Sequence, residues 1–117
     1  MIERYLEAIR ARDHEGILRL FTPEARVVHP VFGELPVAEF YRRLLEATTS
    51  DRTSGETVFQ GPDSRVALYF QDEWTSADGT AFRNPIVLIF DLADDGRARA
   101  LEVVFDTWPF RGDHSTR

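Results

Sequence analysis

The hydrophobic periodicity of this chain changes once, near residue 48, and this change limits the folds it can adopt. Before that point, apolar residues recur every three or four positions, which is typical of amphipathic helices. After it, segments rich in β-branched and aromatic residues are separated by Gly-Pro and Asp-Gly turns. Helices therefore come first and strands joined by tight turns come last. This order predicts an α+β domain with an antiparallel meander and argues against a doubly wound parallel sheet.

Three helices are expected in the first part of the chain. The first begins at Ile2 and ends near Asp13, which can also cap a second, short helix. The second helix is expected to include Phe21 and to end at Thr22, because the residue before a proline disfavours helical backbone. Pro36 suits the first turn of the third helix, whose polar face carries two arginines.

The second part is expected to be mostly strand. Residues 48–55 are polar and rich in Ser, Thr and Asp, so they are expected to form a loop. Residues 81–92 are nearly all apolar after Pro85, which indicates a strand covered on both faces. The expected strands are residues 26–29, 56–61, 66–75, 81–92 and 98–108.

Composition narrows the classes of function. The chain has 117 residues, enough for one domain, expected over residues 1–110 and followed by a polar tail at 111–117. All 14 basic residues are arginines, scattered through a chain of net charge −6, which argues against nucleic-acid binding. The absence of cysteine excludes thiol catalysis, and the three dispersed histidines suggest no metal site. With no apolar run of about 20 residues and no signal-like N-terminus, a cytoplasmic protein without membrane contact is expected.

Several segments together resemble a known family. Residues 12–21 leading into 23–27, and later 83–90 and 102–106, are similar to the nuclear transport factor 2-like superfamily. This superfamily includes ketosteroid isomerase and the SnoaL-like polyketide cyclases. The resemblance extends to about Pro109. It implies a cone: a curved antiparallel sheet whose mouth is covered by the N-terminal helices.

A cone of this kind implies an apolar pocket. Aromatic side chains can line such a pocket, but any single buried aromatic residue is more often a core residue that only packs. Asn84, beside Pro85, could hydrogen-bond a ligand or fix a bend in its strand. The expected lining consists of Phe21, Phe32, Phe40, Tyr69, Trp74, Phe82, Asn84 and Phe105.

Tyr5 and His29 are the candidates for catalysis that the resemblance to ketosteroid isomerase implies. Tyr5 matches the tyrosine that donates to the developing enolate oxygen, and His29 matches the aspartate that moves the proton. An imidazole with an ordinary pKa of about 6.5 can act as a general base near neutrality. Each could instead be structural, Tyr5 as a core tyrosine and His29 bonded to a nearby carbonyl. The family's second oxyanion donor matches Val87, which cannot donate.

Asp106 is a third candidate, because SnoaL-like cyclases place an acid late on the last long strand. It could instead face outward, since strict alternation leaves it on the face opposite Phe105. The resemblance implies a cofactor-independent isomerase or cyclase that transfers protons on a small apolar carbonyl compound. The alternative is a module of the same fold that binds a hydrophobic ligand or a partner without turnover. The family's habit also implies a homodimer formed through the outer face of the sheet.

Overall fold

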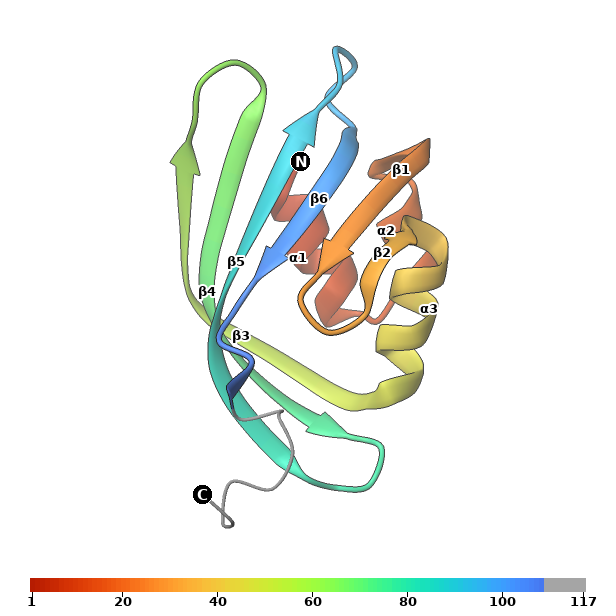
Figure 1. The fold of residues 1–117 in the computed structure, drawn as a ribbon, viewed down its shortest axis with the longest axis vertical. Coiled ribbons are helices and arrows are strands. Elements are labelled where there is room, and N and C mark those ends of the chain that lie inside the picture. Colours follow the sequence, from red (N-terminus) through yellow and green to blue (C-terminus); the bar gives the residue numbers. More distant parts are fainter. Residues whose placement is uncertain (109–117) are drawn as a thin grey trace.

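The computed structural model describes residues 1–108, with only the backbone at residues 50 and 51. Residues 109–117, which include the predicted polar tail, lie outside the described residues. The elements in chain order are α1 (Ile2–Arg10), α2 (His14–Leu18), β1 (Phe21–His29), β2 (Gly33–Pro36), α3 (Val37–Ala47), β3 (Thr48–Gln60), β4 (Arg65–Ser76), β5 (Ala81–Leu92) and β6 (Ala98–Val104) (Figure 1).

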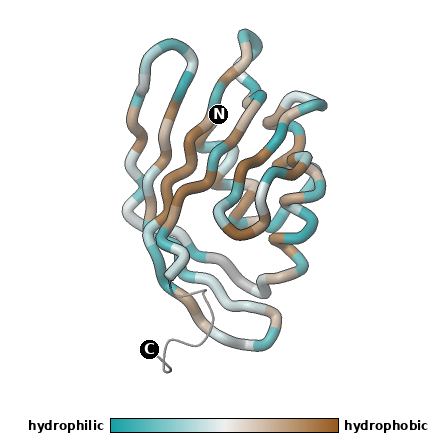
Figure 2. Tube along the Cα trace, in the orientation of Figure 1, coloured by the Kyte–Doolittle hydropathy of each residue, from teal (hydrophilic) through white to brown (hydrophobic). Residues whose placement is uncertain are grey.

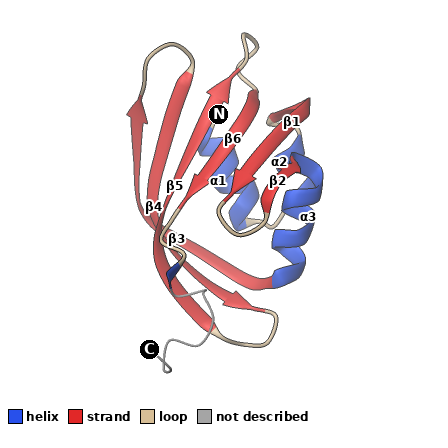
Figure 3. Ribbon diagram, viewed as in Figure 1, coloured by secondary structure: helices blue, strands red, loops and turns tan. Residues whose placement is uncertain are grey.

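The strands form one sheet in the order β2-β1-β6-β5-β4-β3. The sheet curls, and the helices lie on its concave side (Figure 3). This architecture confirms the α+β class and the helix-covered cone. One detail differs from the expected antiparallel sheet, because β1 and β6 are parallel. The remaining pairs, including the β3–β4, β4–β5 and β5–β6 hairpins, are antiparallel. A tight turn fixes the direction of a hairpin, whereas β1 reaches β6 from the distant helical part of the chain.

The predicted loop at residues 48–55 is wrong, because β3 is one strand from Thr48 to Gln60. Its backbone pairs with β4 along almost its whole length. This pairing involves backbone groups, so the order of polar and apolar side chains in β3 does not indicate it. As an edge strand, β3 has only one hydrogen-bonded neighbour, so polar side chains are tolerated along it. The register shifts between Ser54 and Thr57, where Gly55 has a φ of 65°.

Two element boundaries and one additional strand also differ from the sequence-based expectation. The second helix ends at Leu18, and Phe21 begins β1 instead of belonging to that helix. The last strand ends at Val104 and not at residue 108. A short strand, β2, was not expected; it pairs with the end of β1 around the turn at Gly33.

The core lies between the helices and the concave side of the sheet. The amphipathic faces of α1 and α3 supply its helical half, as their spacing predicted. The sheet supplies buried residues from β1, β4, β5 and β6, and Figure 2 shows hydrophobic segments concentrated along these strands, away from the hairpin turns. The fully buried large side chains are Ile17, Val27, Tyr41, Leu68, Phe90 and Leu101.

Candidate functional site

The helices and the concave sheet enclose a cavity of about 220 Å³. Most of its wall is apolar. The apolar lining residues include Leu6, Ile9, Phe32, Phe40, Leu44, Phe70, Ile86, Leu88, Val103 and Phe105. The lining residues with polar groups are Tyr5, His29, Tyr41, Thr48, Thr53, Asp72, Trp74 and Asn84. The polar groups thus interrupt a largely apolar surface at a few places, as is usual for small-molecule sites.

Two tyrosine hydroxyl groups form the helical side of this site. Tyr5 on α1 and Tyr41 on α3 are 4% and 0% exposed, and their hydroxyl oxygens are 2.7 Å apart. One hydroxyl donates to the other, so one O–H of the pair remains directed elsewhere. Burial, and secondarily the neighbouring Tyr5, raises the pKa of Tyr41 well above its usual value. Tyr41 therefore stays protonated near neutrality, and the hydrogen-bonded pair can offer a donor.

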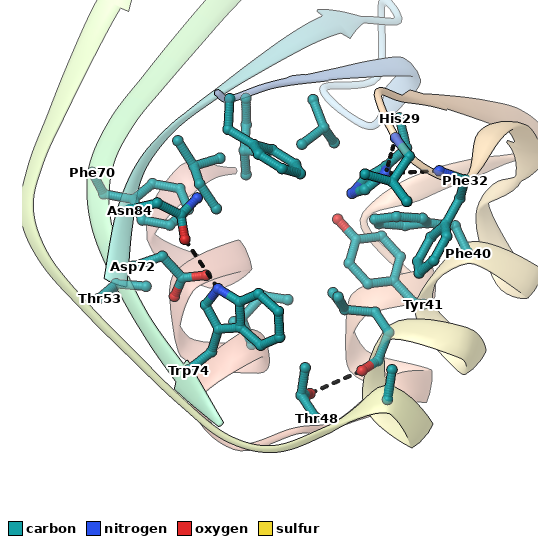
Figure 4. A pocket seen from close by; sticks show the side chains of 18 of the residues that line it. His29, Phe32, Phe40, Tyr41, Thr48, Thr53, Phe70, Asp72, Trp74 and Asn84 are labelled. Atoms are coloured by element: carbon teal, nitrogen blue, oxygen red, sulfur yellow. Dashed lines mark hydrogen bonds between the residues drawn. The ribbon is translucent and has the colours of Figure 1, made fainter. Parts of the chain in front are cut away.

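Aromatic packing fixes the orientation of both tyrosines. The Tyr5 ring meets Phe90 edge-on, with ring centres 5.2 Å apart. The Tyr41 ring meets Phe40 edge-on at 4.8 Å. Edge-to-face contacts of this kind restrict ring rotation and add to the free energy of burial. Figure 4 shows the Tyr41 hydroxyl pointing into the cavity.

His29 ends β1 on the same side of the cavity as Tyr41, with its ring held by the backbone of the following turn. Its Nδ1 accepts hydrogen bonds from the backbone N–H groups of Val31 and Phe32, each at 3.1 Å. Because Nδ1 is an acceptor, the neutral ring carries its proton on Nε2, which Figure 4 shows on the cavity side. Burial lowers the pKa of His29 to about 4. The imidazole is thus neutral at pH 7 and faces the cavity as a donor.

The facing wall, on β4 and β5, carries a second group of polar side chains. Asp72 and Asn84 are directly paired across the two strands, and each is only 7% exposed. The Trp74 indole Nε1–H donates to Asn84 Oδ1 at 3.1 Å. Figure 4 shows these three side chains across the cavity from His29 and Tyr41. A carboxyl group and a carboxamide therefore face two kinds of neutral donor.

A family model of the SnoaL-like domain matches residues 2–101. The chain belongs to the SnoaL-like family. This confirms the resemblance noted in the sequence. No curated protein matches the chain.

Solved structures share the fold of this chain. TerC, crystallised with polyporic acid, is 28% identical, with a TM-score of 0.79 over 93% of this chain and 91% of TerC. An NTF2-like protein of unknown function from Burkholderia pseudomallei is 22% identical, with a TM-score of 0.80 over 93% and 90% of the two chains. A candidate polyketide cyclase from a Silicibacter species is 19% identical, with a TM-score of 0.81 over 93% and 88%. At their lower identities, the last two support the fold alone.

Of the residues expected at the site of this SnoaL-like domain, the structure brings most to the cavity. These are Tyr5, His29, Phe32, Phe40, Trp74, Asn84 and Phe105. Three expected lining residues lie elsewhere. Phe21 is buried in the core against Tyr41 and Phe90. Tyr69 is 37% exposed, because alternation on β4 turns it away from the face of Phe70. Phe82 stacks on Trp74 at 4.4 Å without lining the cavity.

The prediction of Asp106 as a catalytic acid is not supported by its position. Because β6 ends at Val104, Asp106 follows the strand and is exposed, outside the cavity lining. Its carboxylate accepts a hydrogen bond from the Trp108 backbone N–H at 3.0 Å. Val87 also lies outside the cavity lining, whereas its neighbours Ile86 and Leu88 line it. A second hydrogen-bond donor on β5 would therefore have to lie on the inward face, which carries Asn84, and not on the outward face, which carries Val87.

Four polar lining residues, Tyr41, Thr48, Thr53 and Asp72, are not among those expected from the sequence, and two of them bear on the chemistry of the site. Tyr41 lies on the apolar face of α3, where a tyrosine is expected to pack in the core, and only the pairing with Tyr5 reveals its polar role. Asp72 lies two residues from both Phe70 and Trp74 on β4. That spacing places all three on one face and could have indicated an inward carboxyl group.

Among the described residues, no group of three His, Asp or Glu side chains could hold a metal ion. No helix within residues 1–108 is long and apolar enough to span a membrane.

Proposed function

We propose that this protein binds a compact, mostly apolar compound with a conjugated carbonyl group and catalyses a cofactor-independent proton transfer on it. The observation that carries this proposal is the pair of facing polar walls. Neutral donors lie on one side of an apolar cavity, and the Asp72 carboxyl group lies on the other. Donors stabilise a developing oxyanion, while a carboxylate can accept the proton whose loss creates it.

The size of the cavity supports a compact ligand. Its volume of about 220 Å³ lies below the usual range of small-molecule pockets, roughly 300–1,000 Å³. A compound of one or two rings fits that space better than an extended chain. The 28% identical TerC, crystallised with polyporic acid, supports an organic small molecule as the occupant.

The proposed step is a tautomerisation. Asp72 removes a proton from a carbon at the far end of a conjugated system. The electron pair of that C–H bond moves into the conjugated system, and the carbonyl oxygen gains the negative charge. This oxygen receives hydrogen bonds from the tyrosine pair and from Nε2–H of His29. Asp72 then returns the proton to another carbon, so the product is an isomer and nothing else is consumed.

This scheme changes the predicted role of His29 from base to donor. The Nδ1 lone pair already accepts two backbone N–H groups, and protonating it would break both bonds. A neutral imidazole still polarises a carbonyl oxygen through its N–H. The base is therefore assigned to Asp72, whose carboxyl group faces this donor.

The test uses 3-methylcyclohex-2-enone as the probe. In D₂O, ¹H NMR follows exchange of its γ-protons, whose loss places charge on the carbonyl oxygen. The protein should accelerate this exchange, and Asp72→Asn should slow the catalysed rate by about 100-fold or more. Glu73→Gln is the matched control, since the adjacent Glu73 pairs with Arg83 outside the cavity lining and should leave the rate unchanged.

Each other outcome overturns part of the proposal. Exchange that persists in Asp72→Asn would show that Asp72 is not the base. Binding of the enone without exchange would favour the alternative, a non-catalytic ligand-binding module of the same fold. Failure to bind it at all would contradict the proposed ligand class.

A further inference from the structure

Trp74 fixes the orientation of the Asn84 carboxamide. The indole Nε1–H can only donate, so the Asn84 atom that faces it at 3.1 Å is the amide oxygen. The NH₂ group, with two N–H donors, is therefore on the other side of the amide. Asn84 is only 7% exposed and lines the cavity, so its amide group cannot turn freely toward bulk water.

Asp72 is the direct neighbour of this amide. The two residues are register partners in the antiparallel β4–β5 ladder, and both line the cavity. Directly opposed residues of such a ladder have β-carbons about 4.5–5.5 Å apart. A hydrogen-bond acceptor, the carboxyl group, and a donor, the oriented NH₂ group, therefore belong to neighbouring residues on the same wall.

We infer that Asp72 and Asn84 recognise a hydroxyl group at the end of the ligand that lies opposite its carbonyl oxygen. A hydroxyl group can donate to Asp72 and accept from Asn84 at the same time. A carbonyl or ether oxygen would satisfy only Asn84, and a ligand carboxylate would meet the charge of Asp72. The inference rests on the proposed function, because it assumes that the carbonyl oxygen lies at the tyrosine and histidine wall. The ligand class is then a compact conjugated hydroxy-carbonyl compound, such as a hydroxyaryl ketone.

Trp74 is a positioning residue in this arrangement. Without the Nε1–H, the Asn84 carboxamide could turn over and exchange the positions of its oxygen and its NH₂ group. The donor would then point away from the ligand hydroxyl. Loss of the indole N–H should therefore weaken recognition of the hydroxyl group beyond any effect on the apolar body that both probes share.

The experiment compares two probes that differ by one hydroxyl group, 1-tetralone and 6-hydroxy-1-tetralone. In the second, the hydroxyl lies across the conjugated ring from the carbonyl. Isothermal titration calorimetry should show that the wild-type protein prefers the hydroxylated probe by about tenfold, as one hydrogen bond to a charged group would give. Trp74→Phe should reduce this preference, taken as the ratio of the two Kd values, to about threefold or less.

Two further variants keep the test decisive. Asn84→Leu removes the donor at similar size and should likewise reduce the preference to about threefold or less, which covers the case in which Trp74→Phe fails to fold. Arg83→Gln alters the neighbouring residue outside the cavity lining and should retain the full preference.

The result can fail in two distinguishable ways. If wild type binds both tetralones equally well, or if both cavity variants keep the full preference, the hydroxyl inference is wrong while the proposed function stands. If neither tetralone binds, the proposed ligand class itself is contradicted.

Discussion

At the scale of single residues, the state of His29 decides what chemistry the cavity can support. Its ring stacks on Phe32 with centres 4.7 Å apart and meets Phe40 and Phe105 at 5.2 and 5.3 Å. These contacts remove the ring from water, which penalises the imidazolium form. The two backbone N–H groups at Nδ1 act in the same direction, because they bond only to the deprotonated nitrogen. The site therefore keeps its histidine neutral.

A neutral His29 has a consequence for stability. Burial lowers the pKa of His29 in the folded protein to about 4, from 6.5 in the unfolded chain. Between these values the unfolded state takes up a proton that the folded state does not, so acidification favours unfolding. From about pH 7.5 to about pH 5, wild type should lose about 1 kcal/mol more stability than His29→Asn, after allowing for the ring's partial exposure to water. Urea unfolding at the two pH values measures the difference, and parallel losses in both proteins would contradict it.

The family resemblance predicted that Tyr5 and His29 lie at the cavity. It could do so because chains with the same order of elements place corresponding residues at similar positions. It could not give the protonation pattern of His29. That pattern depends on the turn into β2, which points the N–H groups of Val31 and Phe32 at the ring. The inward orientation of Asp72 could be predicted from the alternation of side chains along its strand. The hydrogen bond between Trp74 and Asn84 could not, because it depends on the β4–β5 register.

At the scale of elements, β3 shows where side-chain patterns lose information. A polar segment is compatible with a loop or with an edge strand, since the outer edge of a sheet faces no neighbouring strand. What selects the strand is pairing with β4, a long-range contact that composition does not report. The helices were easier to predict, because their amphipathic faces are local in sequence. Phe21 lies four residues after Ile17, so its spacing predicts a helix, whereas the backbone at Phe21 has already turned into β1.

The irregularity in β3 depends on Gly55. Its φ of 65° lies in the left-handed region, and a Cβ added there would meet no atom within 4 Å. The cost of Gly55→Ala is therefore backbone strain alone, expected at about 1 kcal/mol of unfolding free energy. Ser54→Ala, at the preceding position, should cost less than about half as much. Chemical denaturation of the two variants measures this, and equal stabilities would show that the β3 irregularity tolerates ordinary residues.

At the scale of the whole molecule, the outer face of the sheet carries an apolar row. Tyr69, Val87 and Val104 are successive register partners across β4, β5 and β6. Tyr69 and Val104 are 37% and 43% exposed. Apolar groups gathered on one face commonly mark an interaction surface. Since the concave face is already covered by the helices, the convex face is the side left for another molecule.

We expect a second copy of this chain to cover that row, in agreement with the dimer that the family resemblance implies. A twofold axis through the sheet would bring the row against its own copy, which satisfies the self-complementarity that a symmetric dimer requires. Sedimentation at micromolar concentration should show a dimer for wild type and a monomer for Val104→Glu, because a charge buried at the interface is costly. Far-UV circular dichroism should show that the variant remains folded. Val58→Glu is the matched control: Val58 is 53% exposed but lies outside the row, and its substitution should leave the dimer intact. A monomeric wild type would leave the convex face without this partner and would contradict the prediction.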